Sequence, residues 1–553
     1  MAAAPGTWDL EVDVVAVGSG LGAITAAIVA HDHGQQVVIL EKAPKLGGLS
    51  GYGGGEVYCP NGPHMADIGV SDSDTAARQY IEFLAAGFND PALTDKLLAT
   101  YRTAIDYVEQ KAGVRWVSVE GLSDYYYPDA PGSNTGRYLS VELFDGSELG
   151  EWQQKSWQLS PHLPPGLTHK EMYAWGGLAK VTEWDYELLG ERVANDQRAM
   201  GGGMMGYFLK AALIDRQIPA HVETPARALI LDGGAVIGVQ AERDGRAFNV
   251  RARRGVVLAV GGYDHNREMA RMFENMPDWN SSAQPYFHGD HLVMAGEAGA
   301  ALASVPPTNL GMFFGYNIPG EEHEGVPLFR SSWECGCPHA IWVNRKGVRF
   351  CDESFYKDSQ PRLRHWNGHT QSMDNIPPFL IFDQNYRDRY PLGTFAPGME
   401  IPEDFVARAD SLAELGEKLG IDGAALTATV ERYNEHARNG KDPEFGSGHY
   451  PWTQRLAGDP GFVNPNVGPL DKAPFYGLRL VPVGVGINSH GLQTNVDAQV
   501  MHVRGEPIPG LYAVGNSAAL RDLGGGYQSG TSNMRAITWG YVAGQHLAGT
   551  SGS

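Results

Sequence analysis

The sequence predicts an α/β protein in which a doubly wound domain, built from both ends of the chain, is interrupted by an inserted α+β domain. Residues 12–17 and 37–40 are apolar, β-branched runs typical of buried parallel strands, and the Ala-rich residues 23–33 between them predict a helix. A β-meander is predicted over 228–251, with a further buried strand at 256–260. A strand at 511–514 and a helix at 533–547 are predicted near the other end.

The middle of the chain has a different composition and spacing. Residues 271–475 are richer in Pro, His and Trp and include a helical stretch near 411–437. We therefore predict one discontinuous domain from residues 1–270 and 476–553, and an inserted domain from 271–475.

Composition excludes several classes of protein. The chain has 553 residues and a net charge of −21, with 42% hydrophobic and 19% charged residues, which is typical of a globular protein. The acidic balance argues against a nucleic acid or an anionic membrane as partner. Four cysteines are too few for a disulfide scaffold. No apolar run reaches the roughly 18 residues that a membrane helix needs, and the first residues resemble no secretory signal. We expect a cytoplasmic protein without an integral membrane segment.

The run Gly18-Ser19-Gly20-Leu21-Gly22-Ala23 lies between the first strand and the first helix. Gly18 would allow the tight turn, Gly20 a close approach to a pyrophosphate, and Ala23 close packing of the helix on the strand. Glu41 ends the second strand, where a carboxylate can accept hydrogen bonds from ribose hydroxyls. These features together predict a Rossmann-like dinucleotide site rather than a merely structural turn.

NAD and FAD both use such a unit, and two features favour FAD. Gly47-Gly48-Leu49-Ser50, followed by three glycines at 53–55, could pass close to a planar ring. Gly515-Asn516 follows the late strand and would return to the middle of the cofactor. No second GxGxxG follows a strand, so a nicotinamide cofactor has no evident second site. Ordinary flexible loops remain the alternative for the glycine runs.

The segments 14–23, Glu41-Lys42, 47–50, Gly54-Gly55, 259–263, Gly289-Asp290, 344–353 and 510–516 resemble the fumarate reductase/succinate dehydrogenase-type flavoproteins. The Tyr-rich segment 124–128 and residues 524–540 are most similar to 3-ketosteroid dehydrogenases. The resemblance implies an FAD-binding domain, an inserted catalytic domain and chemistry at their interface. It implies contact with FAD for Gly18, Ser19, Gly20, Leu21, Gly22, Ala23, Glu41, Lys42, Gly48, Leu49, Ser50, Gly54, Val222, Ala259, Gly261, Asp290, Gly515, Asn516, Thr531 and Ser532.

Departures from the family pattern indicate how the flavin is attached and which substrate is excluded. Members with covalent flavin carry a histidine in the segment matching 47–50, which is Gly-Gly-Leu-Ser here, so we expect non-covalent FAD. Fumarate reductases have paired histidines in the segment matching 486–491 and a late arginine that matches Thr531. Their absence argues against fumarate as the substrate.

The resemblance also implies how a ketone would be activated. In the family a tyrosine hydroxyl and a backbone N–H polarise the carbonyl oxygen, and Tyr527 with Ser529 or Gly530 matches them in kind. The Tyr-x-Ser spacing resembles the branch that desaturates the 4,5-bond. The alternative is a Gly-rich packing loop in which Tyr527 is a core aromatic residue.

The proton-abstracting base is the weakest part of the match. The family's tyrosine falls on Leu328, and Tyr316 is the nearest alternative, with simple packing as its competing role. A supporting tyrosine follows Asp124, where three tyrosines leave the register open, and we favour Tyr126. Cys335, Cys337 and Cys351 lack the spacing of a metal site, and none is expected.

The sequence thus predicts an FAD-dependent dehydrogenase that forms a C=C bond beside the carbonyl of a cyclic ketone, a 3-ketosteroid or related alicyclic compound. Without a haem motif or iron–sulfur cysteines, its electron acceptor would be external. Two alternatives stay open: an ene-reductase that runs the same chemistry backwards on an enone or enoate, and a flavin-binding protein without catalysis.

Overall fold

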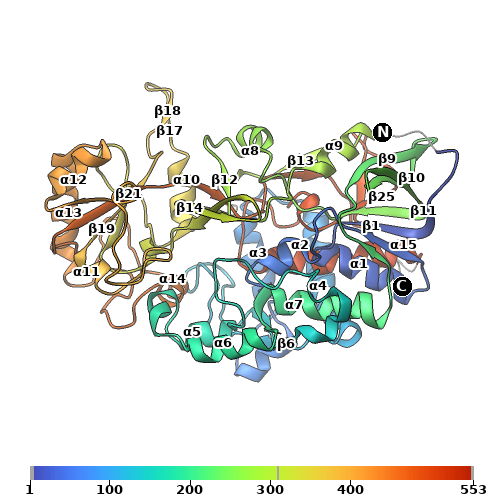
Figure 1. Cartoon of the computed structure of the whole chain (residues 1–553), viewed down its shortest axis with the longest axis horizontal. Coiled ribbons are helices and arrows are strands. Elements are labelled where there is room, and N and C mark those ends of the chain that lie inside the picture. Colours follow the sequence, from blue (N-terminus) through green and yellow to red (C-terminus); the bar gives the residue numbers. More distant parts are fainter. Residues whose placement is uncertain (1–4, 308–310, 550–553) are drawn as a thin grey trace.

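The computed structural model describes residues 5–307 and 311–549. Its main sheet collects strands from both ends of the chain (Figure 1). In spatial order the central path is β24 (Gln499–Met501), β25 (Pro507–Ala513), β11 (Arg246–Leu258), β1 (Leu10–Val17), β2 (Val37–Leu40) and β8 (Ala220–His221), and β10 (Ala235–Arg243) and β9 (Ala226–Asp232) extend it beside β11. The pairings from β25 to β8 are parallel, so the predicted α/β class is confirmed.

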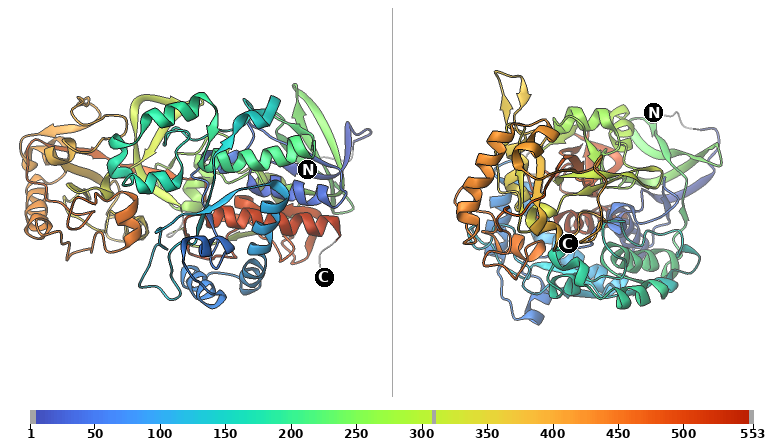
Figure 2. Two further views of the ribbon diagram at one scale, coloured as in Figure 1. Left: turned by 90° about the horizontal axis from the view of Figure 1, so that it is seen from below. Right: turned by 60° about the vertical axis from the view of Figure 1, so that its left-hand side comes forward.

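Strand β1 is buried on both faces of the sheet, which explains its unbroken apolar run. Val14 and Ala16 belong to the core shared with α1 (Leu21–Asp32) and α15 (Thr531–Ala548), whereas Val15 and Val17 belong to the core on the other face. The two helices lie side by side although they come from opposite ends of the chain (Figures 1 and 2). Gly540 permits this, because a Cβ there would lie 2.6 Å from the Gly22 carbonyl oxygen.

The last strand of the predicted meander and the predicted strand at 256–260 are one strand, β11. Its first half forms a hairpin with β10 and its second half pairs with β25, while β1 runs along its other edge. Both halves of β11 are therefore paired without a break in the strand. Local sequence patterns do not specify these pairings, so they did not predict one continuous strand.

A second sheet lies at the opposite end of the molecule from the main sheet (Figure 1). It has the antiparallel order β16 (Ala340–Val343), β19 (Phe379–Asp383), β21 (Phe475–Arg479) and β20 (Ala407–Ala409). The predicted helical stretch is two helices, α12 (Leu412–Leu419) and α13 (Gly423–Ala437), separated at Gly420, which adopts a φ of +70°. The predicted boundary between residues 475 and 476 falls inside β21, and the division into domains stays a prediction.

A third sheet lies between these two sheets and carries β12 (Asn280–Ser281), β22 (Val481–Gly484), β14 (Met312–His323) and β15 (Val326–Ser331) in that order. The remaining short strands are β3 (Val57–Tyr58), β4 (Trp116–Ser118), β5 (Tyr138–Val141), β6 (Phe144–Asp145), β7 (Gln197–Arg198), β13 (Leu302–Ser304), β17 (Trp366–Asn367), β18 (Ser372–Met373) and β23 (His490–Leu492). The remaining α-helices are α2 (Gly48–Tyr52), α3 (Asp74–Ala85), α4 (Pro91–Ala112), α5 (His169–Ala174), α6 (Tyr186–Ala194), α7 (Met200–Leu209), α8 (Arg267–Glu274), α9 (Asp290–Glu297), α10 (Tyr356–Leu363), α11 (Gln384–Arg387) and α14 (Pro451–Leu456).

Candidate active site

A continuous cavity of about 550 Å³ extends from the ends of β1 and β2 to the middle sheet. We call the part near β1 and β2 the dinucleotide end, and the part near β14, α10 and α14 the substrate end. The two parts differ in the residues that form them.

At the dinucleotide end the turn after β1 depends on Gly18. This residue adopts a φ of +99°, and a Cβ there would lie 2.3 Å from the carbonyl oxygen of Ala259 at the end of β11. A side chain would therefore be both strained and in collision with backbone. The glycine brings the ends of two neighbouring parallel strands together, which is where ligands bind in open α/β sheets.

Glu41 and Ser19 connect the glycine run at 18–22 to the one that begins at Gly47. The Glu41 carboxylate accepts hydrogen bonds from the Ser19 hydroxyl at 2.5 Å and from the Ala43 N–H at 2.7 Å. The Gly47 N–H in turn donates to Ser19 Oγ at 3.0 Å. Burial raises the pKa of Glu41, although these hydrogen bonds oppose the shift.

Several groups at this end fit a dinucleotide. Helices α1 and α15 both begin on the cavity wall, and Gly20, the N-cap of α1, provides no capping side chain. Ser532 Oγ, in the first turn of α15, is buried without a hydrogen-bond partner among the described residues. Helix N-termini attract phosphate, and an unpaired buried hydroxyl is costly unless a ligand satisfies it. The residues therefore fit FAD.

Most of the predicted cofactor residues lie on the wall of this cavity, namely Gly18, Ser19, Gly20, Leu21, Gly22, Glu41, Lys42, Gly48, Leu49, Ser50, Gly54, Ala259, Gly261, Asp290, Gly515, Asn516 and Ser532. Lys42 and Asp290 are joined there by an ion pair of 2.6 Å. Ala23, Val222 and Thr531 lie off the wall: Ala23 is buried inside α1, and the Thr531 hydroxyl donates to the Gln528 carbonyl oxygen at 2.6 Å. Their predicted contact with FAD stays a prediction.

At the substrate end, Tyr527, Ser529 and Gly530 lie together on the wall, as the sequence predicts. Burial and the nearby Glu56 carboxylate raise the pKa of Tyr527, so its phenol is protonated and can donate a hydrogen bond. The amine of Lys357 lies 4.9 Å from the centroid of the Tyr527 ring.

The structure places Tyr125 on the wall, and not the predicted Tyr126. The Tyr125 hydroxyl accepts a hydrogen bond of 2.6 Å from the hydroxyl of Tyr356, which also lines the cavity. The Tyr126 ring packs against Phe355 with centroids 5.3 Å apart. Neighbouring side chains point in different directions, so the fold brings Tyr125 rather than Tyr126 to the cavity, and the role predicted for Tyr126 stays a prediction.

Tyr316 also lines the cavity, whereas Leu328 does not. The Tyr316 hydroxyl donates to Glu334 Oε1, which also accepts from the Gly393 N–H at 3.3 Å. Burial and this neighbouring carboxylate raise the pKa of Tyr316 well above its ordinary value. In this state the phenol is a donor, and its predicted role as the base stays a prediction.

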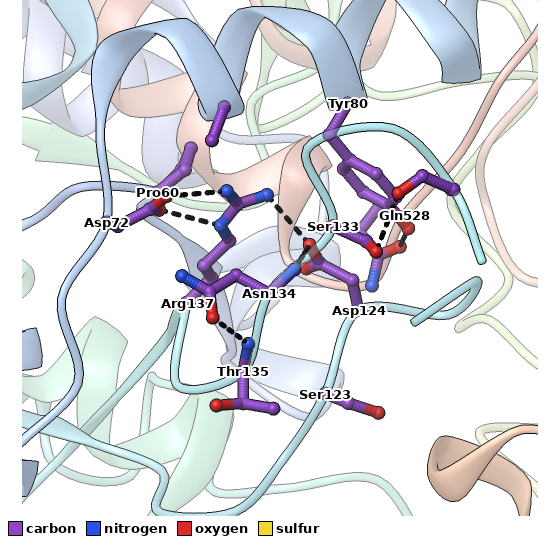
Figure 3. Close-up of polar contacts among 12 residues, drawn as sticks. Pro60, Asp72, Tyr80, Ser123, Asp124, Ser133, Asn134, Thr135, Arg137 and Gln528 are labelled. Atoms are coloured by element: carbon purple, nitrogen blue, oxygen red, sulfur yellow. Dashed lines mark hydrogen bonds and ion pairs between the residues drawn. The ribbon is translucent and has the colours of Figure 1, made fainter. Parts of the chain in front are cut away.

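A buried ionic network joins Arg137 to Asp72 and Asp124, the residue before Tyr125 (Figure 3). The Arg137 guanidinium donates to Asp72 at 2.7 and 2.8 Å and to Asp124 at 2.8 Å, and all three side chains have no exposed surface. Burial raises the pKa of Asp124 to about 6, although Arg137 opposes the shift. Asp124 immediately precedes Tyr125, so the network anchors the backbone of that tyrosine.

Gln528 connects the same region to the Tyr527 loop. Its Oε1 accepts from the Tyr80 hydroxyl at 2.6 Å and from the Tyr125 N–H at 3.2 Å (Figure 3 shows the Tyr80 contact). The residue between Tyr527 and Ser529 therefore fixes the position of the loop relative to Tyr125.

Sequence reasoning missed three residues that line the substrate end, Glu56, His169 and Tyr356, and also Lys357, whose amine lies over the Tyr527 ring. Glu56 directly follows the glycines at 53–55, a signal that could have identified it, because a carboxylate after a cofactor-binding glycine run is exposed to the same site. Tyr356 and His169 reach the cavity only through tertiary packing.

The parallel sheet, the glycine turn after β1 and the cavity shared with a phenol-bearing loop define a flavoprotein oxidoreductase. Residues 13–533 match the FAD binding domain family, and the chain belongs to that family. It is an FAD-dependent oxidoreductase similar to the 3-ketosteroid dehydrogenases.

Two curated relatives and one solved structure illustrate the similarity. The 3-oxosteroid 1-dehydrogenase of Mycobacterium tuberculosis is 32% identical, with 98% of this chain and 99% of that protein covered. The 4-oxocyclohexanecarboxylate 2-dehydrogenase of Sinomonas cyclohexanicum is 32% identical over 97% of this chain and 93% of that protein. The crystal structure of 3-ketosteroid delta1-dehydrogenase from Sterolibacterium denitrificans, in complex with 1,4-androstadiene-3,17-dione, is 29% identical with a TM-score of 0.86, covering 98% and 100% of the chains.

Over the described residues, no helix combines the length and the apolar character needed to cross a bilayer.

Proposed function

We propose that the protein is an FAD-dependent dehydrogenase that introduces a C=C bond beside the carbonyl of a cyclic ketone, of the 3-ketosteroid or oxocyclohexanecarboxylate type. The observation that carries the proposal is the placement of Tyr527, Ser529 and Gly530 on the wall that also carries Gly48, Leu49 and Ser50. A carbonyl held there would lie beside a phenol donor and next to the FAD site. The two curated relatives act on ketones of these two kinds, according to their names.

FAD, when bound at the dinucleotide end, would supply the acceptor for the hydride that leaves the β-carbon. We propose that it is held without a covalent bond, because the segment 47–50 contains no histidine. An external acceptor would then reoxidise it.

The substrate end would activate the ketone and exclude water. The Tyr527 hydroxyl would donate to the carbonyl oxygen, together with a backbone N–H of Ser529 or Gly530, and so stabilise the negative charge that develops when the α-proton leaves. Aromatic side chains would hold the apolar ring, since Phe313 and Trp333 line the same wall with their centroids 4.9 Å apart.

Anaerobic titration of the FAD-loaded protein tests the proposal. Absorbance of oxidised flavin should disappear on addition of a saturated 3-ketosteroid or 4-oxocyclohexanecarboxylate. With Tyr527→Phe, turnover should fall about 10²- to 10³-fold, the loss typical of a missing oxyanion donor, while FAD stays bound. Failure of every cyclic ketone to reduce the flavin would contradict the proposal, and reoxidation of reduced protein by enones alone would favour the reverse reaction.

The tyrosine register has its own test. Tyr125→Phe removes the acceptor of the Tyr356 hydrogen bond on the wall and should slow turnover about tenfold, the value of roughly one hydrogen bond. Tyr126→Phe, which lies off the wall, should change turnover less than about twofold. Steady-state kinetics of the two variants decide the assignment, and the opposite order would restore the register predicted from the sequence.

A further inference from the structure

The dehydrogenation proposed above requires a group that accepts the α-proton, and this inference rests on that function. The tyrosines of the substrate end are hydrogen-bond donors in the described state, and the position of the base in the resembled family falls on Leu328 here. Burial raises the pKa of Tyr125, Tyr316 and Tyr356 well above the ordinary value, so these phenols are protonated. A protonated phenol donates a hydrogen bond but cannot take up a proton.

Carboxylates are the alternative, and the described part of the chain places four of them on the cavity wall: Glu41, Glu56, Asp290 and Glu334. Glu41 and Asp290 belong to the dinucleotide end, where they bond to Ser19 and Lys42. Glu334 accepts from Tyr316 and Gly393 through one oxygen, and its other oxygen is buried. Glu56 is the one that contacts the loop predicted to activate the ketone.

Glu56 is held beside that loop from two sides. Its Oε2 accepts a hydrogen bond from the Ser529 hydroxyl, and the Asn533 side chain donates to its backbone carbonyl oxygen at 2.8 Å. The side chain is 12% exposed and lines the cavity. Each carboxylate oxygen offers two acceptor sites, so capacity remains after these contacts.

His169 lies on the other side of the same carboxylate. Its Nε2 is 3.4 Å from Glu56 Oε1, and its Nδ1 is 2.9 Å from Ser140 Oγ. Burial lowers the pKa of His169, so the ring is neutral and carries one N–H. Because a carboxylate only accepts hydrogen bonds, the tautomer with its N–H on Nε2 suits this contact, and the Ser140 hydroxyl would then donate to Nδ1. The ring lies against Glu56 Oε1 at 3.4 Å and so limits the movement of the carboxylate.

We propose that Glu56 is the proton acceptor of the reaction and that His169 is its positioning residue. The α-C–H bond of the ketone breaks, its electron pair forms the enolate whose oxygen Tyr527 and the loop stabilise, and the proton bonds to a carboxylate oxygen of Glu56.

The electrostatic interaction between Glu56 and Tyr527 favours Glu56 as the proton acceptor and Tyr527 as the hydrogen-bond donor. Burial and, after it, the charge of Glu56 raise the pKa of Tyr527, so the phenol is protonated before the reaction. When Glu56 takes up the proton its charge disappears, so Tyr527 becomes a stronger donor as the enolate oxygen gains charge. Proton removal and carbonyl activation therefore reinforce each other.

The test uses the FAD-loaded protein and follows α-hydrogen exchange of a cyclic ketone in deuterated water by NMR, together with turnover. Glu56→Gln should lower both about 10²- to 10⁴-fold, the range of general base catalysis, with unchanged flavin content. Glu56→Asp should restore part of both rates, which also covers the case in which the glutamine variant folds poorly. Glu324→Gln, a glutamate away from the wall, is the matched control and should leave both rates unchanged.

A binding measurement is independent of turnover. A nitrophenolate mimics the enolate, and its absorbance reports its ionisation when it binds. Glu56→Gln removes a negative charge from the site and should bind the phenolate several-fold more tightly than the unaltered protein. Equal or weaker binding would place Glu56 away from the developing charge and overturn the assignment.

Two further outcomes distinguish failure of the Glu56 assignment from failure of the proposed function. Retained exchange in Glu56→Gln, with loss in Tyr316→Phe, would overturn the role of Glu56 and make Tyr316 the acceptor. Absence of exchange and of flavin reduction in the unaltered protein, with every ketone, would overturn the proposed function and this inference with it.

Discussion

The two ends of the cavity are built in different ways. The dinucleotide end consists of short segments, 18–22, 41–43 and 48–50, whose backbone geometry and mutual hydrogen bonds define it. The substrate end consists of side chains such as Tyr125, Tyr356 and Tyr527, brought together from distant parts of the chain and supported by a buried ionic network. One end is thus determined by local conformation, and the other by long-range packing and charge pairing.

The largest expected effect concerns the ionic network of Arg137, Asp72 and Asp124. Arg137→Met leaves Asp72 and Asp124 buried without their cation and should lower the free energy of unfolding by about 3–5 kcal/mol. The folded fraction should still bind FAD, because Arg137 does not reach the dinucleotide end. Urea unfolding followed by fluorescence measures the first effect, and flavin absorbance after gel filtration measures the second.

The matched control is Arg102→Met, since Arg102 pairs with Asp74 on the surface, with side chains 34% and 69% exposed. Its loss should cost less than about 1 kcal/mol. Equal losses for the two arginines would show that the buried network does not support the substrate end as described.

At the dinucleotide end, Gly18→Ala should lower the free energy of unfolding by about 2–3 kcal/mol and abolish FAD binding. The added methyl group would collide with the Ala259 carbonyl at a φ of +99°. Gly34→Ala is the control: Gly34 also has a positive φ of +83°, but no atom lies within 4 Å of its added Cβ. It should cost about 1 kcal/mol and leave FAD binding intact. Retention of flavin by Gly18→Ala would refute the close approach of β1 and β11.

The smallest effect is expected for Lys42→Met. The ion pair of Lys42 with Asp290 is short, at 2.6 Å, but the two side chains are 25% and 36% exposed, so solvent screens the interaction. FAD affinity should fall less than about fivefold, or roughly 1 kcal/mol, as measured by quenching of flavin fluorescence. A loss of a hundredfold or more would show that side-chain charge, rather than backbone geometry, dominates this end.

The part of the fold that the sequence predicted is the part with local signals. The unit from β1 through α1 to β2 was predicted because apolar runs, a glycine turn and an Ala-rich helix follow one another within about 30 residues. The continuity of β11 was not predicted, because it depends on pairing with β10 and β25, whose positions no local pattern specifies.

The same distinction applies to the site. Tyr527, predicted from its Gly-rich context, lies on the cavity wall, and its role stays a prediction. The wall carries Tyr125 in place of the predicted Tyr126, and Tyr356 was not predicted. A run of three tyrosines has no internal signal that tells which ring faces the cavity. That choice depends on the Asp124–Arg137 ion pair and on the Tyr125 contact with Gln528.

The amino-acid sequence by itself determined the glycine turns, the acidic residue at the end of β2 and hence the dinucleotide end, because φ angles and strand-turn-helix patterns are properties of neighbouring residues. Only the tertiary structure decided which tyrosines line the substrate end and that Glu56, Ser529 and His169 meet there. Such contacts arise when distant segments pack into a common core, and the energy that selects them belongs to the assembled fold rather than to any one segment.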